Sequence, residues 1–261
     1  MDWVQVIFLS ILQGVLEFLP ISSSGHLILF PALLGWQDQG LALDIAVHAG
    51  SFLAIIIYFK KDIVSIVFRN SIGIDSQKNT REFLFVILAT LPILIIGFVI
   101  SDEFLAFLRM PKVIATATGV FGILLWWTDR TFEGSQKLDK VNAKGFLFIG
   151  LMQVIALIPG TSRSGITITA GRVLGINRTE ATRFSFLLAI PTIGASIVWQ
   201  GLEFINTTQV VEWNKLFIAV ILSALSSWLS IALFLKFIQL IQFSWFMGYR
   251  LFLAGLTFIV L

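Results

Sequence analysis

The chain has 261 residues, of which 57% are hydrophobic and only 13% are charged, and its formal net charge is +3. Soluble domains carry about 25% charged residues, so this composition indicates an integral membrane protein. The small net charge does not favour a nucleic-acid partner, and the absence of cysteine excludes disulfides and thiolate metal sites. Apolar stretches recur from end to end, which predicts one membrane domain over residues 1–261.

Six apolar stretches approach the ~20 residues with which a helix crosses a bilayer. The predicted spans are Leu41–Phe59, Phe83–Ile100, Val113–Trp127, Phe184–Trp199, Leu216–Leu235 and Trp245–Leu261. Two other apolar regions are interrupted: Val4–Leu34 breaks at Pro20, and Phe146–Arg172 breaks at Pro159. Such broken pairs indicate re-entrant hairpins, which are tolerated where protein or a water-filled cavity satisfies the freed backbone groups. The predicted fold is an all-α polytopic membrane protein with six transmembrane helices and two re-entrant helical hairpins.

Lysine and arginine gather in the loops after the first and third predicted spans. Because cytoplasmic loops are enriched in these residues, both loops should lie inside and the turns of residues 101–112 and 201–214 outside. The first hairpin then enters from the outer face and the second from the cytoplasmic face. Trp3, Trp36, Trp199 and Trp213 fit an outer aromatic belt. The residues expected at the cytoplasmic side are Arg172, Arg178 and Arg183 at the rim, and Asp129 with Arg130 as a helix-end charge pair.

A weak internal similarity that needs gaps relates the two halves of the chain. The segment Thr80–Pro92 resembles Thr182–Pro191, and a glutamine precedes each break. We therefore predict that the halves, about residues 1–127 and 128–261, form an inverted repeat whose broken helices meet near the membrane midplane.

The first break follows a polar helix face. Gln13 and Glu17 are four residues apart, hence on one face, and this face leads into Ser22, Ser23 and His26. A carboxylate deep in a bilayer is costly, so Glu17 should face the protein interior or a wet cavity. As an alternative, Gln13 and Glu17 form only a polar pair between helices, and Ser22 only caps the helix that follows.

The second break offers an arginine, hydroxyls and backbone amides to one anion. Around Arg163 lie Gly160, Thr161, Ser162, Ser164 and Thr167. Arginine binds phosphate oxygens in bidentate geometry without losing its charge, and a helix N-terminus favours phosphate. As an alternative, Arg163 is held by helix-end carbonyls, or by Glu17 as an ion pair within the membrane. We expect the two breaks to meet and form one phosphate site.

The residues of the two breaks are of the types that catalyse phosphoryl transfer, a reaction in which positioning and charge stabilisation supply most of the catalysis. Because the site is buried among helices, its substrate should be a phosphate on a lipid. Asp44 and His48 are expected to be a packed pair on the first span, outside the site. No cluster has the ligand spacing of a zinc site.

Three motifs carry a family resemblance: Gln-x-x-x-Glu at 13–17, Phe-Leu-Pro-x-Ser-Ser-x-Gly-His at 18–26 and Pro-Gly-x-Ser-Arg-Ser-x-x-Thr at 159–167. With them the chain resembles the undecaprenyl pyrophosphate phosphatase family, bacterial membrane enzymes associated with bacitracin resistance. The resemblance implies removal of the terminal phosphate from undecaprenyl pyrophosphate, at a site open to the outer side of the plasma membrane. It also implies stimulation by a divalent cation, Mg²⁺ or Ca²⁺. The oligomeric state is left open, a homodimer included.

The resemblance also assigns roles to individual residues. Functional residues carried over are Glu17, Ser23, His26, Ser162, Arg163 and Ser164, with Gly160 and Thr161 lining the phosphate loop and Gln13, Ser22 and Thr167 in support. Gln13 stands where some relatives have Glu, which weakens a metal site of two carboxylates and leaves Glu17 as the candidate ligand. No tightly bound cofactor is expected.

The nucleophile and the broad function each leave alternatives. Ser23 attacks with His26 as its base, or His26 attacks while Ser23 positions the phosphate, or water attacks with both in support. Glu17 would orient His26 or help to hold a cation. A lipid-carrier transporter is the rival function, since inverted repeats with broken helices are a transporter architecture. A helical scaffold would leave the arginine within the membrane unexplained.

Overall fold

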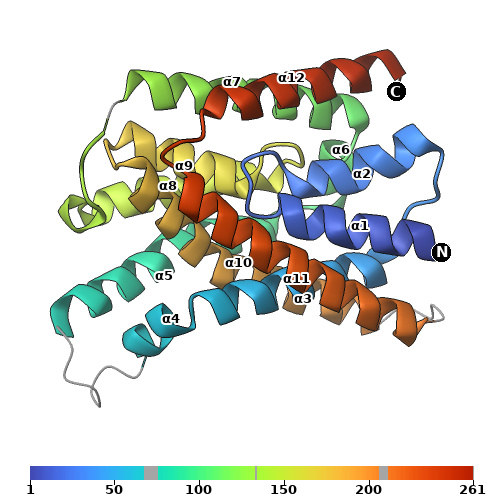
Figure 1. The fold of residues 1–261 in the computed structure, drawn as a ribbon, viewed down its shortest axis with the longest axis horizontal. Coiled ribbons are helices and arrows are strands. Elements are labelled where there is room, and N and C mark those ends of the chain that lie inside the picture. Colours follow the sequence, from blue (N-terminus) through green and yellow to red (C-terminus); the bar gives the residue numbers. More distant parts are fainter. Residues whose placement is uncertain (68–75, 133, 206–210, 261) are drawn as a thin grey trace.

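The computed structural model describes residues 1–67, 76–132, 134–205 and 211–260, and this part of the chain is helical without a β-strand (Figure 1). The helices are α1 Trp3–Leu16, α2 Ser23–Leu34, α3 Gly40–Tyr58, α4 Lys60–Val67, α5 Ser76–Val99, α6 Asp102–Leu108, α7 Pro111–Thr131, α8 Ala143–Val154, α9 Arg163–Val173, α10 Arg178–Ile205, α11 Trp213–Phe237 and α12 Phe243–Val260. Two short 3-10 turns, Leu138–Lys140 and Ile155–Leu157, flank α8. The all-α prediction is confirmed.

Five described helices are long and apolar enough to cross a membrane. They are Gly40–Tyr58, Arg81–Val99, Arg178–Ile205, Trp213–Phe237 and Phe243–Val260, and they match five of the six predicted spans. The sixth prediction, Val113–Trp127, falls inside α7, whose 21 residues are sufficient in length but do not meet the same apolar criterion. Lys112, Asp129 and Arg130 lie near its ends, which lowers its hydropathy. The protein is a multi-pass membrane protein.

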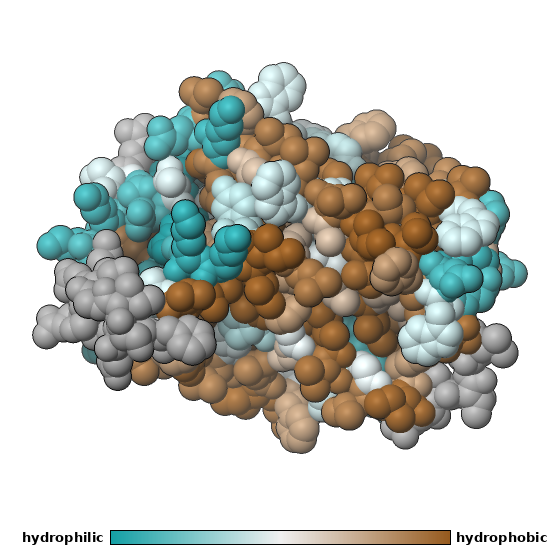
Figure 2. All heavy atoms as spheres, turned by 60° about the horizontal axis from the view of Figure 1, so that its bottom comes forward, coloured by the Kyte–Doolittle hydropathy of each residue, from teal (hydrophilic) through white to brown (hydrophobic). Residues whose placement is uncertain are grey.

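Hydrophobic side chains cover the middle of one face of the molecule. Figure 2 shows this brown band on one face, with hydrophilic residues gathered toward the two ends of the long axis. Phe98, Phe252 and Ile259 are each more than 65% exposed. Large apolar side chains so widely exposed are unfavourable in water, and they are the surface that lipid tails solvate.

The helices pack in corresponding pairs. Helix α1 packs on α11 and α8 packs on α5, while α3 packs on α10 and α7 on α12. Figure 1 shows α1 and α2 at the end of the molecule that holds the N-terminus, with α8 and α9 toward the opposite end. The similarity of Thr80–Pro92 to Thr182–Pro191 would equate α5 with α10. The packing does not follow that alignment. If α1 corresponds to α8, the α1–α11 and α8–α5 contacts make α11 correspond to α5, and α3 then corresponds to α10.

Small residues bring α11 close to α1 and α3. A Cβ added at Gly14 would lie 2.5 Å from the Ser223 carbonyl oxygen, and one at Gly50 would lie 2.4 Å from a carbonyl oxygen of α11. Beside them, the Ser227 hydroxyl donates to Ser51 at 2.9 Å, and the Ser51 and Ser223 hydroxyls lie 3.1 Å apart. Such small and hydroxyl side chains are how membrane helices approach closely.

The predicted pairing of Asp129 with Arg130 is wrong. Asp129 instead forms ion pairs with Arg172 at 3.3 Å and Arg178 at 2.5 Å, and the Arg130 guanidinium lies 5.7 Å from the ring centre of Trp126. Neighbouring residues on a helix point in different directions, whereas residues three or four apart share a face. Asp129 therefore faces α9 and α10, and Arg130 faces Trp126 one turn earlier.

Candidate active site

Each break ends in a serine that caps the helix after it. Ser22 precedes α2 with φ 70°, and Ser162 precedes α9 with φ 71°. Their hydroxyls accept from the backbone N–H groups of Gly25 at 3.3 Å and Gly165 at 3.1 Å. A positive φ is uncommon for a residue other than glycine, so both breaks use the same unusual turn. The capping role considered for Ser22 is confirmed.

The two breaks meet, as predicted. The Gly160 N–H donates to Ser22 Oγ at 3.0 Å, and the Ser164 hydroxyl donates to the Leu19 carbonyl at 2.9 Å. Gly160 has φ +94°, and a Cβ at this position would lie 2.4 Å from the Ile114 carbonyl oxygen. Only glycine fits here, so the second break lies directly against α7, and its bonds to Ser22 and Leu19 bring the N-termini of α2 and α9 together.

Glu17 is the centre of the polar group at this junction. Its Oε2 accepts from the Ser23 hydroxyl at 2.6 Å and from Gln13 Nε2 at 2.8 Å, and its Oε1 accepts from Arg163 Nη2 at 3.0 Å. The side chains of Glu17 and Arg163 are 9% and 11% exposed. Arg163 also donates to the Ser185 carbonyl, so the ion pair considered as an alternative is present. These two bonds use two of its five N–H donors.

His26 is paired with a different helix. Its Nδ1 lies 2.6 Å from the Ser22 carbonyl oxygen and its Nε2 lies 2.7 Å from the Tyr249 hydroxyl on α12. A carbonyl can only accept, so Nδ1 carries a proton, and Nε2 of the neutral ring accepts from tyrosine. Glu17 accepts from Ser23, whereas the buried His26 ring lies one turn further along α2, against α12. The alternative in which His26 is the base of Ser23 therefore has no Ser23–His26 bond behind it.

Some polar groups of the loop before α9 are hydrogen-bonded to other groups close to them in the chain. The Thr161 N–H donates to the Ile158 carbonyl at 3.1 Å, so this amide, which we expected to bind phosphate, is already bonded. The Ser162 and Ser164 hydroxyls lie 3.1 Å apart. The Arg163 and Ser164 amides are in the first turn of α9, where N–H groups have no acceptor within the helix. Thr161 Oγ1 is buried and has no hydrogen-bond partner among the described residues.

Thr167 fixes α9 on α10. Its hydroxyl lies 2.9 Å from the Arg163 carbonyl oxygen and 2.7 Å from Ser185 Oγ. The Ser185 carbonyl accepts from the guanidinium of Arg163, so Thr167 helps to hold the arginine through Ser185. Asp44 and His48 are both on α3. His48 Nδ1 lies 2.7 Å from the backbone oxygen of Asp44, so this bond does not join their side chains.

Oxygen atoms beside Glu17 are the candidate ligands for a cation. Gln13 Oε1 is buried and has no hydrogen-bond partner within the described ranges. Among those residues no group of three or more His, Asp or Glu side chains is placed to hold a metal ion. Glutamine and carboxylate oxygens suit Mg²⁺ or Ca²⁺, so the two side chains fit a cation that takes its other ligands from phosphate and water.

The whole chain has known relatives. A family model described as bacitracin resistance protein BacA matches residues 6–256. The chain belongs to this family. A relative named undecaprenyl-diphosphatase 1, from Pseudoalteromonas translucida, is 44% identical over 100% of this chain and 98% of its own. Relatives named undecaprenyl-diphosphatase from Teredinibacter turnerae and Alteromonas mediterranea are 45% and 46% identical, over 99% and 96% of both chains. The predicted resemblance is confirmed.

In this BacA family member, α12 brings two residues to the site that the motifs did not include. Tyr249 binds His26, and the guanidinium of Arg250 donates to backbone carbonyls of both breaks, at Pro20 and Gly160. A signal for Arg250 was present, because an arginine in the middle of a predicted span indicates function by the same rule that singled out Arg163.

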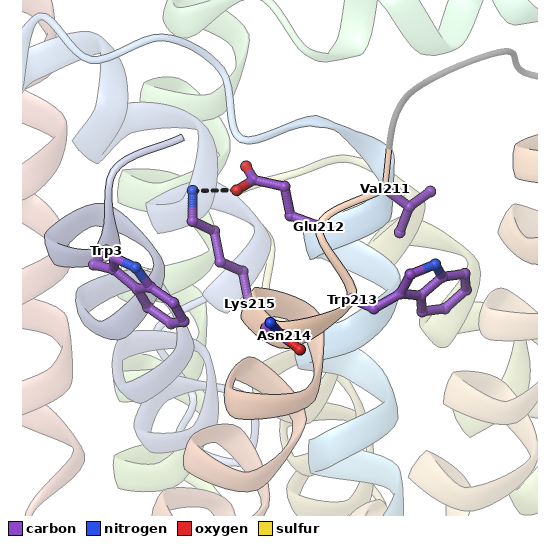
Figure 3. Close-up of a pocket in the computed structure, with 6 residues that line it drawn as sticks. All are labelled: Trp3, Val211, Glu212, Trp213, Asn214 and Lys215. Atoms are coloured by element: carbon purple, nitrogen blue, oxygen red, sulfur yellow. Dashed lines mark ion pairs between the residues drawn. The ribbon is translucent and has the colours of Figure 1, made fainter.

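A surface hollow of about 470 Å³ in this BacA family member lies away from the breaks (Figure 3). It is lined by Trp3, Val211, Glu212, Trp213, Asn214 and Lys215. Lys215 Nζ lies 2.6 Å from Glu212 and 5.8 Å from the ring centre of Trp3. The hydrogen bond from Lys215 lowers the pKa of Glu212. Trp3 and Trp213, both predicted for the outer belt, thus lie at the same end of the molecule.

Proposed function

We propose that this protein is an undecaprenyl-diphosphatase, which hydrolyses undecaprenyl pyrophosphate to undecaprenyl phosphate and inorganic phosphate. Relatives with that name are 43–46% identical over nearly the full length. The structural observation that carries the mechanism is the group around Glu17, where a serine hydroxyl and an arginine contact one carboxylate at the meeting point of two helix N-termini. The product would return the lipid carrier to cell-wall synthesis.

The pyrophosphate binds to Arg163 and to the amides that begin α9. Arg163 retains N–H donors beyond those that contact Glu17 and Ser185, and its fork matches phosphate oxygens. The amides of Arg163 and Ser164 and the positive end of the helix dipole act on the same anion. The N-terminus of α2 faces the same junction, so positive ends of two helices stabilise the charge that builds up in the transition state.

Ser23 is the nucleophile and Glu17 is its base. The Ser23 oxygen attacks the terminal phosphorus, Glu17 takes the hydroxyl proton across their 2.6 Å contact, and undecaprenyl phosphate leaves as the phosphoanhydride bond breaks. Water then attacks the phosphoserine, inorganic phosphate leaves, and Ser23 regains its proton. The sum is one water consumed for one anhydride cleaved.

His26 supports this chemistry without touching phosphorus. Both of its ring nitrogens are engaged, by the Ser22 carbonyl and the Tyr249 hydroxyl, and the residue is 0% exposed. An imidazole nitrogen must be free to attack, so this arrangement favours a structural role for His26. It holds the first turn of α2, which carries Ser23.

A divalent cation at the site would be held by Gln13 Oε1 and Glu17. When bound, it would neutralise charge on the phosphate oxygens. The chain supplies one carboxylate here, so ion affinity should be modest and dependent on substrate. Removing divalent ions with a chelator should then lower phosphate release without unfolding the protein.

The membrane arrangement proposed for this function has six spans, with α7 as the sixth, and two re-entrant hairpins, α1–α2 and α8–α9. Each half has the same order of one hairpin and three spans, and each break has a capping serine with positive φ. The packing pairs α1–α11 and α8–α5 correspond across the halves. These observations support a single domain built as an inverted repeat. The loop charges and the family resemblance are the grounds for placing it in the plasma membrane with its site open to the outer side.

A quenched-reaction experiment tests the nucleophile. Substrate labelled in the terminal phosphate is mixed briefly with enzyme, and the denatured protein is treated with acid or alkali. We expect a labelled adduct that survives acid and is lost in alkali, as a phosphoserine is, and no adduct with Ser23→Ala. An acid-labile, alkali-stable adduct would instead identify His26. Absence of any adduct would favour direct attack by water.

Hydrolysis is separated from transport by assaying the purified protein in detergent, where there are no two sides. Wild type should release phosphate from undecaprenyl pyrophosphate, and Arg163→Ala should not. An inert wild type would leave the transporter interpretation, and a fully active Arg163→Ala would remove Arg163 from the site.

A further inference from the structure

Arg250 lies in the middle of α12 and is 0% exposed. In the part of the chain that the structure describes, no ion pair within 4 Å joins it to a carboxylate. Its acceptors, at 2.8 to 3.5 Å, are the backbone carbonyls of Pro20, Ala117, Thr118, Gly160 and Thr161. A buried arginine without an acid is costly within a membrane. An apolar side chain would fill the same space at lower cost, so packing alone does not account for this residue.

One guanidinium joins the two breaks. Pro20 belongs to the first break, Gly160 and Thr161 belong to the second, and the remaining two carbonyls are on α7. The planar guanidinium presents five donors in fixed directions, whereas a lysine ammonium presents three from one atom. Arg250 therefore fixes both breaks against α7 in a way that lysine cannot reproduce.

The same contacts orient an amide at the start of α9. In a trans peptide the N–H points opposite to the preceding carbonyl, and the described residues contain no cis peptide. Because the Thr161 carbonyl points at Arg250, the Ser162 N–H points away from it. Ser162 is the residue that caps α9, directly before Arg163.

Helix α7 leaves room for Arg250 by means of glycine. A Cβ added at Gly122 would lie 3.1 Å from both Cβ and Nε of Arg250, which is a tight contact. A Cβ added at Gly119, three residues earlier on the same interface, would lie 3.6 Å from Ala254 in ordinary contact. The two glycines therefore serve as a test position and its control: Gly122 contacts Arg250, whereas Gly119 contacts apolar side chains.

We propose that Arg250 is a positioning residue that sets the two breaks against each other and orients the start of α9 for the substrate phosphates. It acts through the backbone and does not contact substrate. The inference rests on the proposed function, because the start of α9 that it orients carries Arg163 and the Arg163 and Ser164 amides assigned to phosphate binding.

The first test replaces the guanidinium. Methylenediphosphonate, a pyrophosphate analogue that is not hydrolysed, should raise the thermal unfolding midpoint of the wild type in detergent. At temperatures below their own midpoints, Arg250→Lys and Arg250→Gln should have kcat/KM lowered about 100-fold, the effect of displacing reacting groups by ~1 Å, and should lose most of the analogue-induced shift. A variant with a lower midpoint but undiminished kcat/KM and a full analogue shift would overturn the proposal.

The second test keeps Arg250 and moves it, so it remains decisive if both Arg250 variants fail to fold. Gly122→Ala should lower kcat/KM several-fold and weaken the analogue shift, while Gly119→Ala should match the wild type in both. Equal activity of the two alanine variants would contradict a positioning role.

Arg163→Lys distinguishes this inference from the proposed phosphate site. If Arg163→Lys retains the full analogue shift, the site assignment itself is wrong, whatever Arg250 does. If Arg163→Lys loses the shift and Arg250→Lys keeps it, the site stands and the positioning role falls.

Discussion

At the scale of single residues, the site depends on one carboxylate that three side chains share. Glu17 accepts from Ser23, Gln13 and Arg163, so it can position the serine, accept its proton and hold the arginine. Removing the charge of Glu17 would leave the buried Arg163 guanidinium without a counter-ion and the Ser23 hydroxyl without its carboxylate acceptor. The two neighbouring serines on α2 allow this assignment to be tested.

Ser23→Ala should lower kcat by about 10³-fold or more, since loss of a nucleophile removes the covalent route. Ser24→Ala is the matched control, because Ser24 is exposed and its hydroxyl lies beside Ser22, whereas it is Ser23 that bonds Glu17. Phosphate release in detergent measures both. Comparable activities for the two variants would exclude Ser23 as the nucleophile.

Tyr249→Phe removes the hydroxyl that donates to His26 Nε2 at 2.7 Å. One such hydrogen bond contributes ~1 kcal/mol, so kcat should fall about five-fold without loss of folded protein. If His26 were the nucleophile, freeing Nε2 would instead raise the rate. Steady-state kinetics of purified Tyr249→Phe distinguishes the two directions.

At the scale of the helices, α11 depends on glycine at its contact with α3. A Cβ at Gly50 would lie 2.4 Å from the Val220 carbonyl oxygen, and backbone cannot move aside as a side-chain tip can. Gly50→Ala should therefore destabilise the protein by ~1–3 kcal/mol, seen as a lower unfolding midpoint in detergent. Gly255→Ala on α12 is the control: its Cβ meets nothing within 4 Å, so its midpoint should stay level or rise slightly.

Sequence patterns predicted where the helices and breaks lie better than they predicted which residues contact one another. Long apolar runs define α3 and α11 because a bilayer imposes a minimum length, and proline and glycine located both breaks. The span in α7 was less clear because a helix that packs against α9 and α12 can carry polar residues. The partners of His26 and Asp129 were missed, since 223 residues separate His26 from Tyr249 and local spacing carries no information about such contacts.

At the scale of the whole molecule, orientation in the membrane can be measured directly. The chain has no cysteine, so a single introduced thiol is the only one. Lys137→Cys and Asn214→Cys place exposed thiols in loops predicted to be cytoplasmic and outer. In intact cells, a maleimide that does not cross membranes should label only Asn214→Cys, and both should react after lysis. The reverse pattern would invert the proposed topology.

The contact of Arg250 with the Pro20 carbonyl joins residues that are 230 positions apart. During synthesis, the segment that carries Glu17 and Ser23 leaves the ribosome long before α12 is made. On the roles proposed above, the nascent chain holds Ser23 before it holds the arginine that aligns the two breaks, and phosphatase activity should begin only when α12 is in place. A chain that ended before α12 would lack the guanidinium that donates to the Pro20, Gly160 and Thr161 carbonyls, and these buried groups would have no donor from that helix.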